Sequence, residues 1–317
     1  MKSRVVLGLV LIFAVCGTAS AAQTFVTIGS GGVGGTYYPL GGVMAELLSN
    51  GGVNIRANSR STSASRENCR LVASDQVQIG MTMGSTLWQA YNGVEAFTDD
   101  GKLDLLTLMN MYPAPQHLVT TTKTGIKTFE DIRGKKVSVG APGGGDQVLT
   151  NLILAAAGWD PAKDIQRRQL TQPEAVTALK DGNIDAAFFN FAVPGSAIME
   201  IAAVRDVALI SLPDAVIEKV CKDNPFMMSS AIVAGTYAKQ DADVKTIADG
   251  NFLVVSSKMA EQVAYDCVRI FIEKREEILK TTPQAVNFVP VKAAVGIIPF
   301  HPGAARYLKE LGVEVKP

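Results

Sequence analysis

Two glycine-rich loops carry the groups in this sequence that are best suited to bind a ligand. The first, GSGGVGG at residues 29–35, spells G-x-G-x-x-G from Gly29 to Gly34, after a strand-like run and before a helix-like one. The second, APGGG at 141–145, has the same setting. A loop that leads into a helix presents unpaired N–H groups and the positive end of the helix dipole. The sequence therefore predicts two sites that favour a negatively charged group.

The first loop has the form of a dinucleotide-binding fingerprint, but the partner of that fingerprint is missing. A carboxylate should follow about 20 residues on, where it would bind the ribose hydroxyls. Residues 48–60 read LSNGGVNIRANSR and contain no acid. Free nicotinamide cofactor is also largely cytoplasmic, whereas this chain is expected to be exported. We therefore expect no NAD and no other cofactor.

The N-terminus predicts that export. In residues 1–22, two basic residues precede an apolar run at 5–15, and small residues in a small-x-small pattern follow, as in a secretory signal peptide. The apolar run is too short to span a bilayer. Cys16 leaves a lipoprotein as the alternative, although its neighbours fit a lipid-attachment box poorly. We expect a periplasmic mature chain.

Charge and histidine content argue against several other classes of protein. Removing Lys2 and Arg4 with the signal leaves 30 − 2 = 28 basic and 30 acidic residues, a net charge of −2. No basic block suggests a nucleic-acid surface. The two histidines, His117 and His301, lack the neighbours that a catalytic triad or a metal site requires. We expect no metal and no enzyme activity, with an exported hydrolase as the main rival.

A strand–loop–helix–strand–helix–strand pattern occurs twice. Ile28 and Val139 are 111 residues apart, and Ile79 and Ala186 are 107 apart. Alternating strands and helices imply parallel sheets, and ligands of such sheets bind beyond the carboxyl ends of the strands. The first unit is expected to have strands at 25–28, 53–58 and 77–83 and helices at 38–49 and 65–73; the second, strands at 135–140, 165–170 and 184–189 and helices at 146–158 and 171–182.

These units predict two α/β lobes that face each other across a cleft. Short extended runs at 117–122 and 229–235 are the expected hinge strands. The rest of the chain, about 237–317 and including 244–254, is expected to be mostly helical and to pack on the first lobe. The predicted boundaries are 23–118 plus 232–317 for lobe 1 and 119–231 for lobe 2.

Seven segments occur along most of the mature chain in a specific order and spacing: GSGGVGGTYYPLGGVMAELL, SASRENCRL, AYNG, MYPAPQHLV, GIKTFEDIRGKKVSVGAPGGG, EAVTALKDGNIDAAFFNFAVP and HPGAARYLKE. Together they resemble the TAXI family, the immunogenic-protein branch of the solute-binding proteins that serve TRAP transporters. The resemblance implies a two-lobed periplasmic binding protein fold (type II-like), each lobe a mostly parallel sheet flanked by helices. It also implies a monomer that closes on a small carboxylate such as glutamate or 2-oxoglutarate and docks on a TRAP membrane permease with fused subunits.

The resemblance also implies the ligand-binding residues. They are Gly34, Gly35, Thr36, Tyr37, Tyr38, Ser63, Ala64, Ser65, Met83 and Ser85 in the first lobe, and Gly143, Gly144, Gly145, Asp146, Asn190 and Phe191 in the second.

Several of these residues have a structural alternative. One of the two tyrosines is expected to pack in the core, residues 63–65 to cap a helix, and Phe191 to pack in the core. Met83 and Asp146 depart from the family's pattern, which has an amide and a hydroxyl there. Asp146 is either a helix N-cap or a cleft residue that repels an anion or attracts an amino group. The pocket therefore suits a less polar or an amino-bearing acid.

Two questions remain open at the level of sequence. Of the three cysteines that follow the signal, Cys221 and Cys267 are the favoured disulfide pair, and three buried thiols are the alternative. A ligand-sensing module that contacts a signalling receptor is the alternative to transport, because a docking surface has no readable motif.

Overall fold

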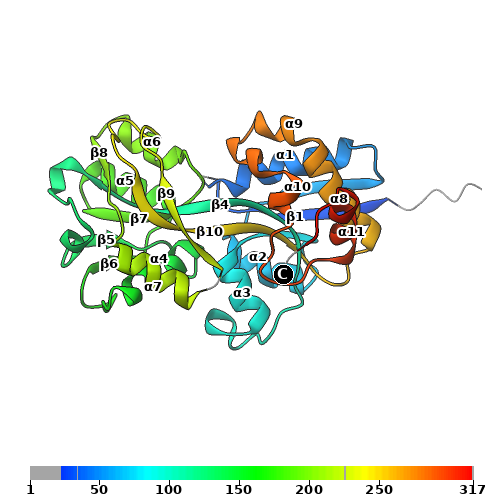
Figure 1. Cartoon of the computed structure of the whole chain (residues 1–317), viewed down its shortest axis with the longest axis horizontal. Coiled ribbons are helices and arrows are strands. Elements are labelled where there is room, and N and C mark those ends of the chain that lie inside the picture. The colour runs from blue at the N-terminus through cyan, green and yellow to red at the C-terminus, as the bar shows by residue number, and fades with distance from the viewer. Residues whose placement is uncertain (1–22, 34, 225, 316–317) are drawn as a thin grey trace, which may run out of the picture.

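The computed structural model describes residues 23–33, 35–224 and 226–315. The predicted signal peptide at 1–22, with Cys16, and the predicted ligand residue Gly34 lie outside the described residues. Figure 1 shows two α/β lobes joined by two long strands. The fold is therefore the expected two-lobed one.

The two predicted units have the same wiring. In the first lobe β1 pairs in parallel with β2 and with β3, and in the second lobe β5 pairs in parallel with β6 and with β7. The central strand of each trio is thus the first in sequence, which confirms the repeat. The strands are β1 (Thr24–Gly29), β2 (Ile55–Arg60), β3 (Ile79–Met83), β5 (Lys136–Ser138), β6 (Gln166–Arg168) and β7 (Ala186–Asn190).

The helices of the two units begin within one residue of the predicted positions. Thr171 and Glu174 form the predicted capping box at the start of the last one. The helices are α1 (Tyr37–Asn50), α2 (Ser65–Ala73), α4 (Gly145–Ala156) and α5 (Gln172–Asp181). The pattern did not predict α3 (Gly84–Asn92), which begins directly after β3.

The hinge differs from the prediction. The long strands are β4 (Leu106–Thr121) and β10 (Val244–Val255), which pair antiparallel and run between the lobes (Figure 1). The prediction that 244–254 is helical was wrong. β10 is almost entirely buried, so it lacks the polar face that would separate a strand from a helix. The segment 229–235 lies largely in β9 (Met227–Ile232), which pairs with β10 instead of crossing between lobes.

The lobe boundaries at 118/119 and 231/232 stay a prediction. Ile232, Tyr237 and Val244 pack with Phe189 and Ile198 of the second lobe, which favours a second crossing later in the chain, within β10. The remaining elements of the second lobe are α6 (Ser196–Ala202), β8 (Val207–Leu209) and α7 (Asp214–Asp223).

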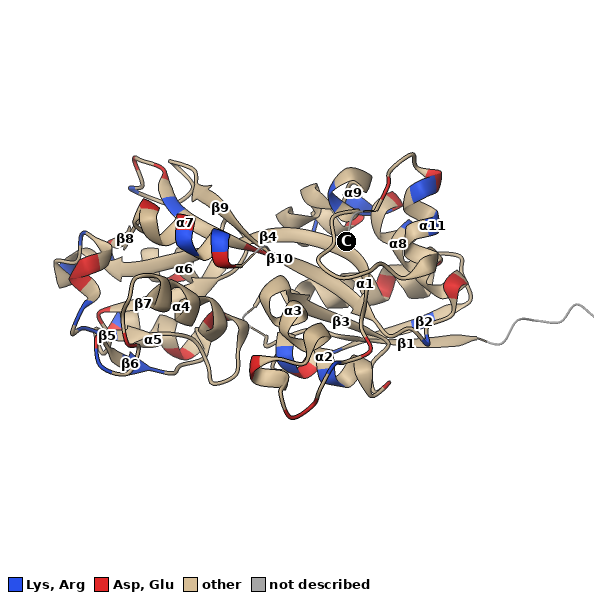
Figure 2. Cartoon of the chain, turned by 60° about the horizontal axis from the view of Figure 1, so that its bottom comes forward, with Lys and Arg blue, Asp and Glu red and all other residues tan. Residues whose placement is uncertain are grey.

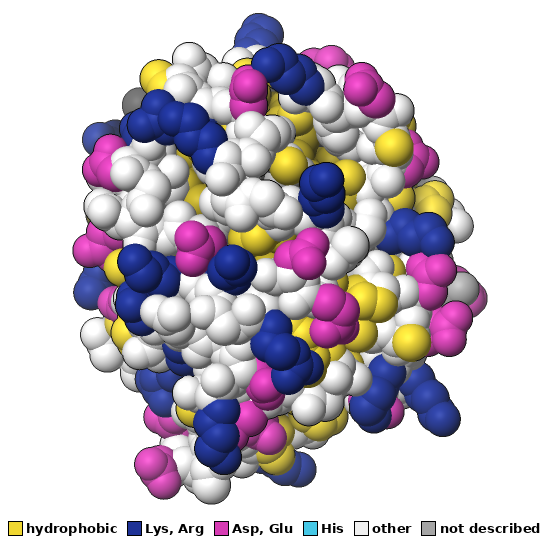
Figure 3. Space-filling view, turned by 90° about the vertical axis from the view of Figure 1, so that its left-hand side faces the viewer, with side chains coloured by type: hydrophobic (Ala, Val, Ile, Leu, Met, Phe, Trp, Pro, Cys, Tyr) yellow, Lys and Arg dark blue, Asp and Glu magenta, His cyan; other side chains and the backbone are white. Residues whose placement is uncertain are grey.

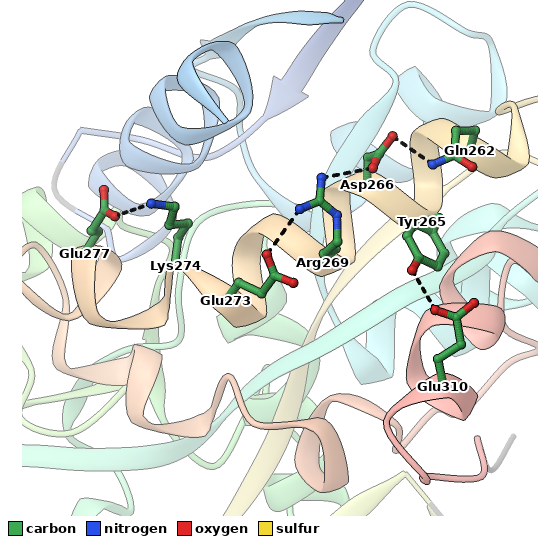
Figure 4. Close-up of polar contacts among 8 residues, drawn as sticks. All are labelled: Gln262, Tyr265, Asp266, Arg269, Glu273, Lys274, Glu277 and Glu310. Atoms are coloured by element: carbon green, nitrogen blue, oxygen red, sulfur yellow. Dashed lines mark hydrogen bonds and ion pairs between the residues drawn. The ribbon is translucent and has the colours of Figure 1, made fainter. Parts of the chain in front are cut away.

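The C-terminal helices cover the first lobe. They are α8 (Glu261–Glu273), α9 (Arg275–Leu279), α10 (Pro290–Ala293) and α11 (Pro302–Glu310). Their buried faces join the core of β1 and α1, while their outer faces carry ion pairs such as those of Arg269 with Asp266 and Glu273 (Figure 4). Tyr265 donates from α8 to Glu310 of α11 at 2.6 Å. The predicted packing on the first lobe is confirmed for these helices, but it was wrong for the start of the predicted region, where Tyr237, Val244 and Ile247 pack in the second lobe.

The favoured disulfide does not form. Cys221, Cys267 and Cys69 are all free thiols. Cys267 is buried in the core of the first lobe, whereas Cys221 packs against the core of the second. Cys221 and Cys267 thus belong to separate cores, and the alternative of three buried thiols holds for Cys69 and Cys267, whereas Cys221 is half-buried.

Candidate functional site

A cavity of about 470 Å³ lies between the lobes, at the carboxyl ends of their parallel strands. Figure 2 shows α2 and α3 of the first lobe opposite α4 and α5 of the second. The residues that line the cavity are Gly31, Gly32, Val33, Gly35, Thr36, Tyr37, Thr62, Ser63, Ala64, Ser65, Met83, Tyr112 and Asn251 from the first lobe and the hinge, and Ala141, Gly144, Gly145, Asp146, Thr171, Gln172, Pro173, Asn190 and Phe191 from the second lobe.

Four helix N-termini meet at this cavity. The first residues of α1, α2, α4 and α5 all line it. No side chain caps the N-terminus of α1, α2 or α4, whereas Thr171 caps α5. Uncapped helix N-termini leave N–H groups for a ligand, and their dipoles favour negative charge. The arrangement suits an anionic group bound between two lobes.

Asn68 of α2 fixes the loops of the first lobe. Its buried amide donates to Ser30 O at 2.7 Å and to Met81 O at 2.8 Å, and Thr62 donates to its Oδ1 at 2.8 Å. A single side chain thus ties α2 to the ends of β1 and β3. Gly29 leaves room for this side chain, since a Cβ there would lie 2.6 Å from Asn68 Oδ1. Gly29, the first glycine of the fingerprint, is therefore required for the packing of Asn68 against β1.

The hinge contributes polar groups to the cavity floor. Tyr37 OH donates to Asn251 Oδ1, and Asn251 pairs with Tyr112 across β10 and β4. Burial raises the pKa of both phenols, Tyr37 and Tyr112, so both hydroxyls stay protonated at neutral pH. Tyr37 is buried and Tyr38 is exposed, so Tyr37 both packs in the core and lines the cavity.

Ala64 has a strained backbone at the cavity wall. Its φ of 68° and ψ of −140°, just before α2, belong to a region that is essentially restricted to glycine. Such strain costs about 1–3 kcal/mol and persists where the surroundings impose it. The strain accompanies the turn that aims the N-terminus of α2 at the cavity.

Asp146 is the one charged residue that lines the cavity in the described part of the chain. It lies in the first turn of α4 but does not cap the helix. Instead its Oδ1 accepts from Asn190 N at 3.2 Å and its Oδ2 accepts from Gln172 Nε2 at 3.1 Å. Burial raises the pKa of this carboxyl to about 6, opposed by these hydrogen bonds. The N-cap alternative was therefore wrong: Asp146 lines the cavity, and its effect on a ligand stays a prediction.

Glycines let the two lobes approach closely. A Cβ at Gly145 would overlap Met83 Sδ of the opposite lobe, and a Cβ at Gly143 would lie 2.9 Å from Arg66 Nη1. Gln172 Oε1 lies 3.8 Å from the Cβ position of Gly35. Side chains of the first lobe thus lie next to the glycine loop of the second lobe, and Gln172 of the second lobe lies next to the glycine loop of the first. Such close contacts are expected of a cleft that closes on a ligand.

The structure brings most of the predicted site residues together. Of those described, all but Tyr38, Ser85 and Gly143 line the cavity. Ser85 is fully buried at the start of α3, where its N and Oγ donate to Asp249 of β10. Whether the lining residues bind a ligand stays a prediction. Asn190 uses its side-chain amide to bind Ala114 O at 2.8 Å.

Sequence reasoning missed the contributions of the hinge strands and of the start of α5. Tyr112 and Asn251 lie in β4 and β10, outside the segments predicted to cross between the lobes, and nothing in the local sequence indicated that they would line the cavity. Thr171 and Gln172 were identified only as a helix start. Since three other helix starts had been assigned to the site, the repeat itself was the signal that could have added them.

The two histidines are structural. His117 is buried between Pro115 O and Tyr237 OH, and burial lowers its pKa to about 4. His301 caps α11 by accepting from Gly303 N. Neither lines the cavity. Within the described ranges, no three His, Cys, Asp or Glu residues cluster as metal ligands, and no helix has the length and apolarity to cross a bilayer.

A second hollow, of about 830 Å³, lies at the far end of the second lobe around β8 and the 238–245 segment. Figure 3 shows this end of the molecule, where basic and acidic side chains are interspersed with small apolar areas. Lys239 pairs with Asp206, and Lys245 with Asp214, on its rim. No convergent set of unpaired polar groups marks this hollow within the described residues.

A match to the NMT1-like family covers residues 28–312. The chain belongs to this family. Solved structures share its fold at low identity. The aliphatic sulphonate binding protein SsuA of Escherichia coli is 17% identical, with a TM-score of 0.51 over 91% of this chain and 79% of that one. Lipoprotein Tp32 of Treponema pallidum is 13% identical, with a TM-score of 0.51 over 83% of this chain and 98% of that one.

A third structure, the alkanesulfonate-binding protein SsuA of Xanthomonas axonopodis pv. citri bound to MOPS, is 14% identical, with a TM-score of 0.50 over 92% of this chain and 85% of that one. These likenesses confirm the α/β fold of periplasmic binding proteins.

Proposed function

We propose that this chain is the periplasmic solute-binding component of a TRAP-type secondary transporter of the TAXI branch. It captures a small carboxylate or amino acid and delivers it to the membrane permease. The observation that carries the proposal is the cavity between the lobes, where four helix N-termini converge and no histidine, metal cluster or nucleophile–base pair lies among the described lining residues. The resemblance of the ordered segments to the TAXI family supports the TRAP assignment.

The mechanism is closure without chemistry. A ligand that contacts both lobes stabilises the closed form, and a shift from 1:99 to 99:1 needs about 10⁴-fold preferential binding, roughly 5.5 kcal/mol. A few hydrogen bonds from N–H groups and hydroxyls to a charged ligand, each about 1.5–3 kcal/mol, supply that energy. The permease would then recognise the closed form.

Native mass spectrometry of the protein purified from its own periplasm tests solute capture. We expect a bound small acid, whose addition to stripped protein reduces the radius of gyration measured by X-ray scattering. Thr36→Val should weaken binding without unfolding the protein, since it removes a hydroxyl beside the N-terminus of α1. A particle whose dimensions and heat of titration stay unchanged with every metabolite tried would refute capture. Uptake by vesicles that contain a TRAP permease, dependent on this protein, tests delivery.

A further inference from the structure

The charges around the cavity point to the chemical class of the solute. No Lys, Arg or His is among its described lining residues, and Asp146 is the single formal charge. Arg66 flanks the α4 loop near Gly143 and is not among the lining residues, and the hydrogen bonds to the Asp146 carboxylate come from Asn190 and Gln172. A solute with two or more negative charges would therefore face one carboxylate and no basic side chain.

Asp146 has free capacity to bind a donor. An ionised carboxylate can accept about four hydrogen bonds. Asn190 N and Gln172 Nε2 supply two of them, one to each oxygen. Because Asp146 lines the cavity, a donor group of a solute there can reach this carboxylate. A partly buried carboxylate without a cation is costly unless something pairs with it.

The opposite lobe offers the complementary groups. The uncapped N-termini of α1 and α2 line the cavity together with the side chains of Thr36 and Ser65. Ser65 Oγ accepts from Met83 N at 3.1 Å and hydrogen-bonds the Tyr37 phenol, and the Thr36 side chain hydrogen-bonds that of Tyr112, so the N–H groups of the two helix starts are the main donors left for a solute. These groups suit one carboxylate. A solute held this way spans the cleft, with its negative end on the first lobe and its positive end on the second.

The rest of the cavity is mostly uncharged. Met83 and Phe191, both nearly buried, and the rings of Tyr37 and Tyr112 form its inner walls. They favour an apolar or neutral body in contact with aromatic and thioether groups.

Resting on the proposed function, we infer that the solute is an α-amino acid with an uncharged side chain, whose ammonium group binds Asp146 while its carboxylate binds the N-termini of α1 and α2. The inference assigns Asp146 the role of selecting an amino group and predicts that dicarboxylates are poor ligands.

A thermal-shift screen of the mature protein with the L-amino acids, 2-oxoglutarate and a short alkanesulfonate gives the first test. We expect the largest increase in melting temperature from amino acids with uncharged side chains. Calorimetry then compares the best amino acid with its 2-hydroxy analogue on the wild-type protein. We expect the analogue to bind at least tenfold more weakly, because it lacks the cation but keeps the carboxylate.

The same titrations on the Asp146→Asn variant test whether Asp146 binds the amino group and not the carboxylate of the solute. We expect at least a tenfold loss for the amino acid and less than a threefold change for the 2-hydroxy acid. Asp181→Asn, an exposed site at the end of α5, is the matched control and should change neither value. The comparison of the two solutes on wild-type protein needs no variant, so it stands even where Asp146→Asn fails to fold.

Three results would overturn the inference: equal binding of the two analogues, an unchanged amino-acid affinity in Asp146→Asn, or 2-oxoglutarate as the best ligand. Each of these leaves solute capture intact. Absence of binding by every class of solute would instead count against the proposed function, and the inference with it.

Discussion

Substituting Gly145 by alanine should prevent full closure of the lobes while leaving each lobe folded. In this structure a Cβ at Gly145 would overlap Met83 Sδ of the opposite lobe and lie 3.3 Å from Met83 Cγ and Cε. Ordinary contacts need about 3.5–4.0 Å between such atoms, so Met83 or the lobe must shift by roughly 1 Å or more. Overpacking of this kind costs about 1–3 kcal/mol, which is a fivefold to 150-fold loss of ligand affinity.

The ligand-free protein should behave differently. Gly145 is the first residue of α4, where alanine is a better helix former than glycine by up to about 1 kcal/mol. The melting temperature without ligand should therefore stay the same or rise. Gly42→Ala is the matched control, because Gly42 lies in α1 with no atom within 4 Å of its Cβ position.

Calorimetric titration with the most stabilising solute measures the loss of ligand affinity in Gly145→Ala. A double-mutant cycle with Met83→Ala tests whether the overlap with Met83 causes this loss. If this overlap prevents the lobes from closing, Met83→Ala should remove it and restore affinity to the Gly145→Ala variant. The cycle should then show a coupling energy of about 1–3 kcal/mol. An unchanged dissociation constant in Gly145→Ala, or an equal loss of stability without ligand, would refute the argument that the contact between Met83 and Gly145 limits ligand binding.

Three further predictions concern stability. Ala64→Gly should raise the free energy of unfolding by about 1 kcal/mol in denaturant titrations, because it relieves a φ of 68°; a decrease would contradict the strain. Tyr37→Phe should lower it by about 1–3 kcal/mol, since Asn251 Oδ1 loses its donor in a buried site. Burial raises the pKa of Asp249 to about 7, so the contribution of this carboxyl to stability should be full below about pH 4 and be lost as pH rises through 7; Asp249→Asn should reduce the slope of stability against pH in that range, and an unchanged slope would exclude Asp249 as its source.

The local pattern of the sequence predicted the repeated units well because strand, glycine loop and capped helix follow one another within each unit. α2 matches its predicted range, and α5 begins at its capping box. Both signals act within a few residues, so no tertiary information is required. The agreement of β2-β1-β3 with β6-β5-β7 follows from the same local alternation.

The hinge could not be predicted in the same way. β10 has both faces covered, so its side chains do not alternate between apolar and polar. Two of its most informative residues, Asp249 and Asn251, are polar but buried, and their partners Ser85 and Tyr37 lie 164 and 214 residues away. Such pairs exist only in the folded chain. The disulfide prediction failed for a related reason, because sequence does not indicate that Cys221 and Cys267 belong to separate cores.

The glycines that first suggested a dinucleotide site have a different use in this fold. Along the two loops, the lack of side chains lets backbone N–H groups face the cavity and lets Met83 and Arg66 of the first lobe lie against the second. Backbone N–H groups bind any small anion, so they supply affinity and little selectivity. Selectivity must then come from the lining positions that do carry side chains. Met83 and Asp146 are two of these positions. We therefore expect substitutions at Met83 and Asp146 to change solute preference before any change in the loops does.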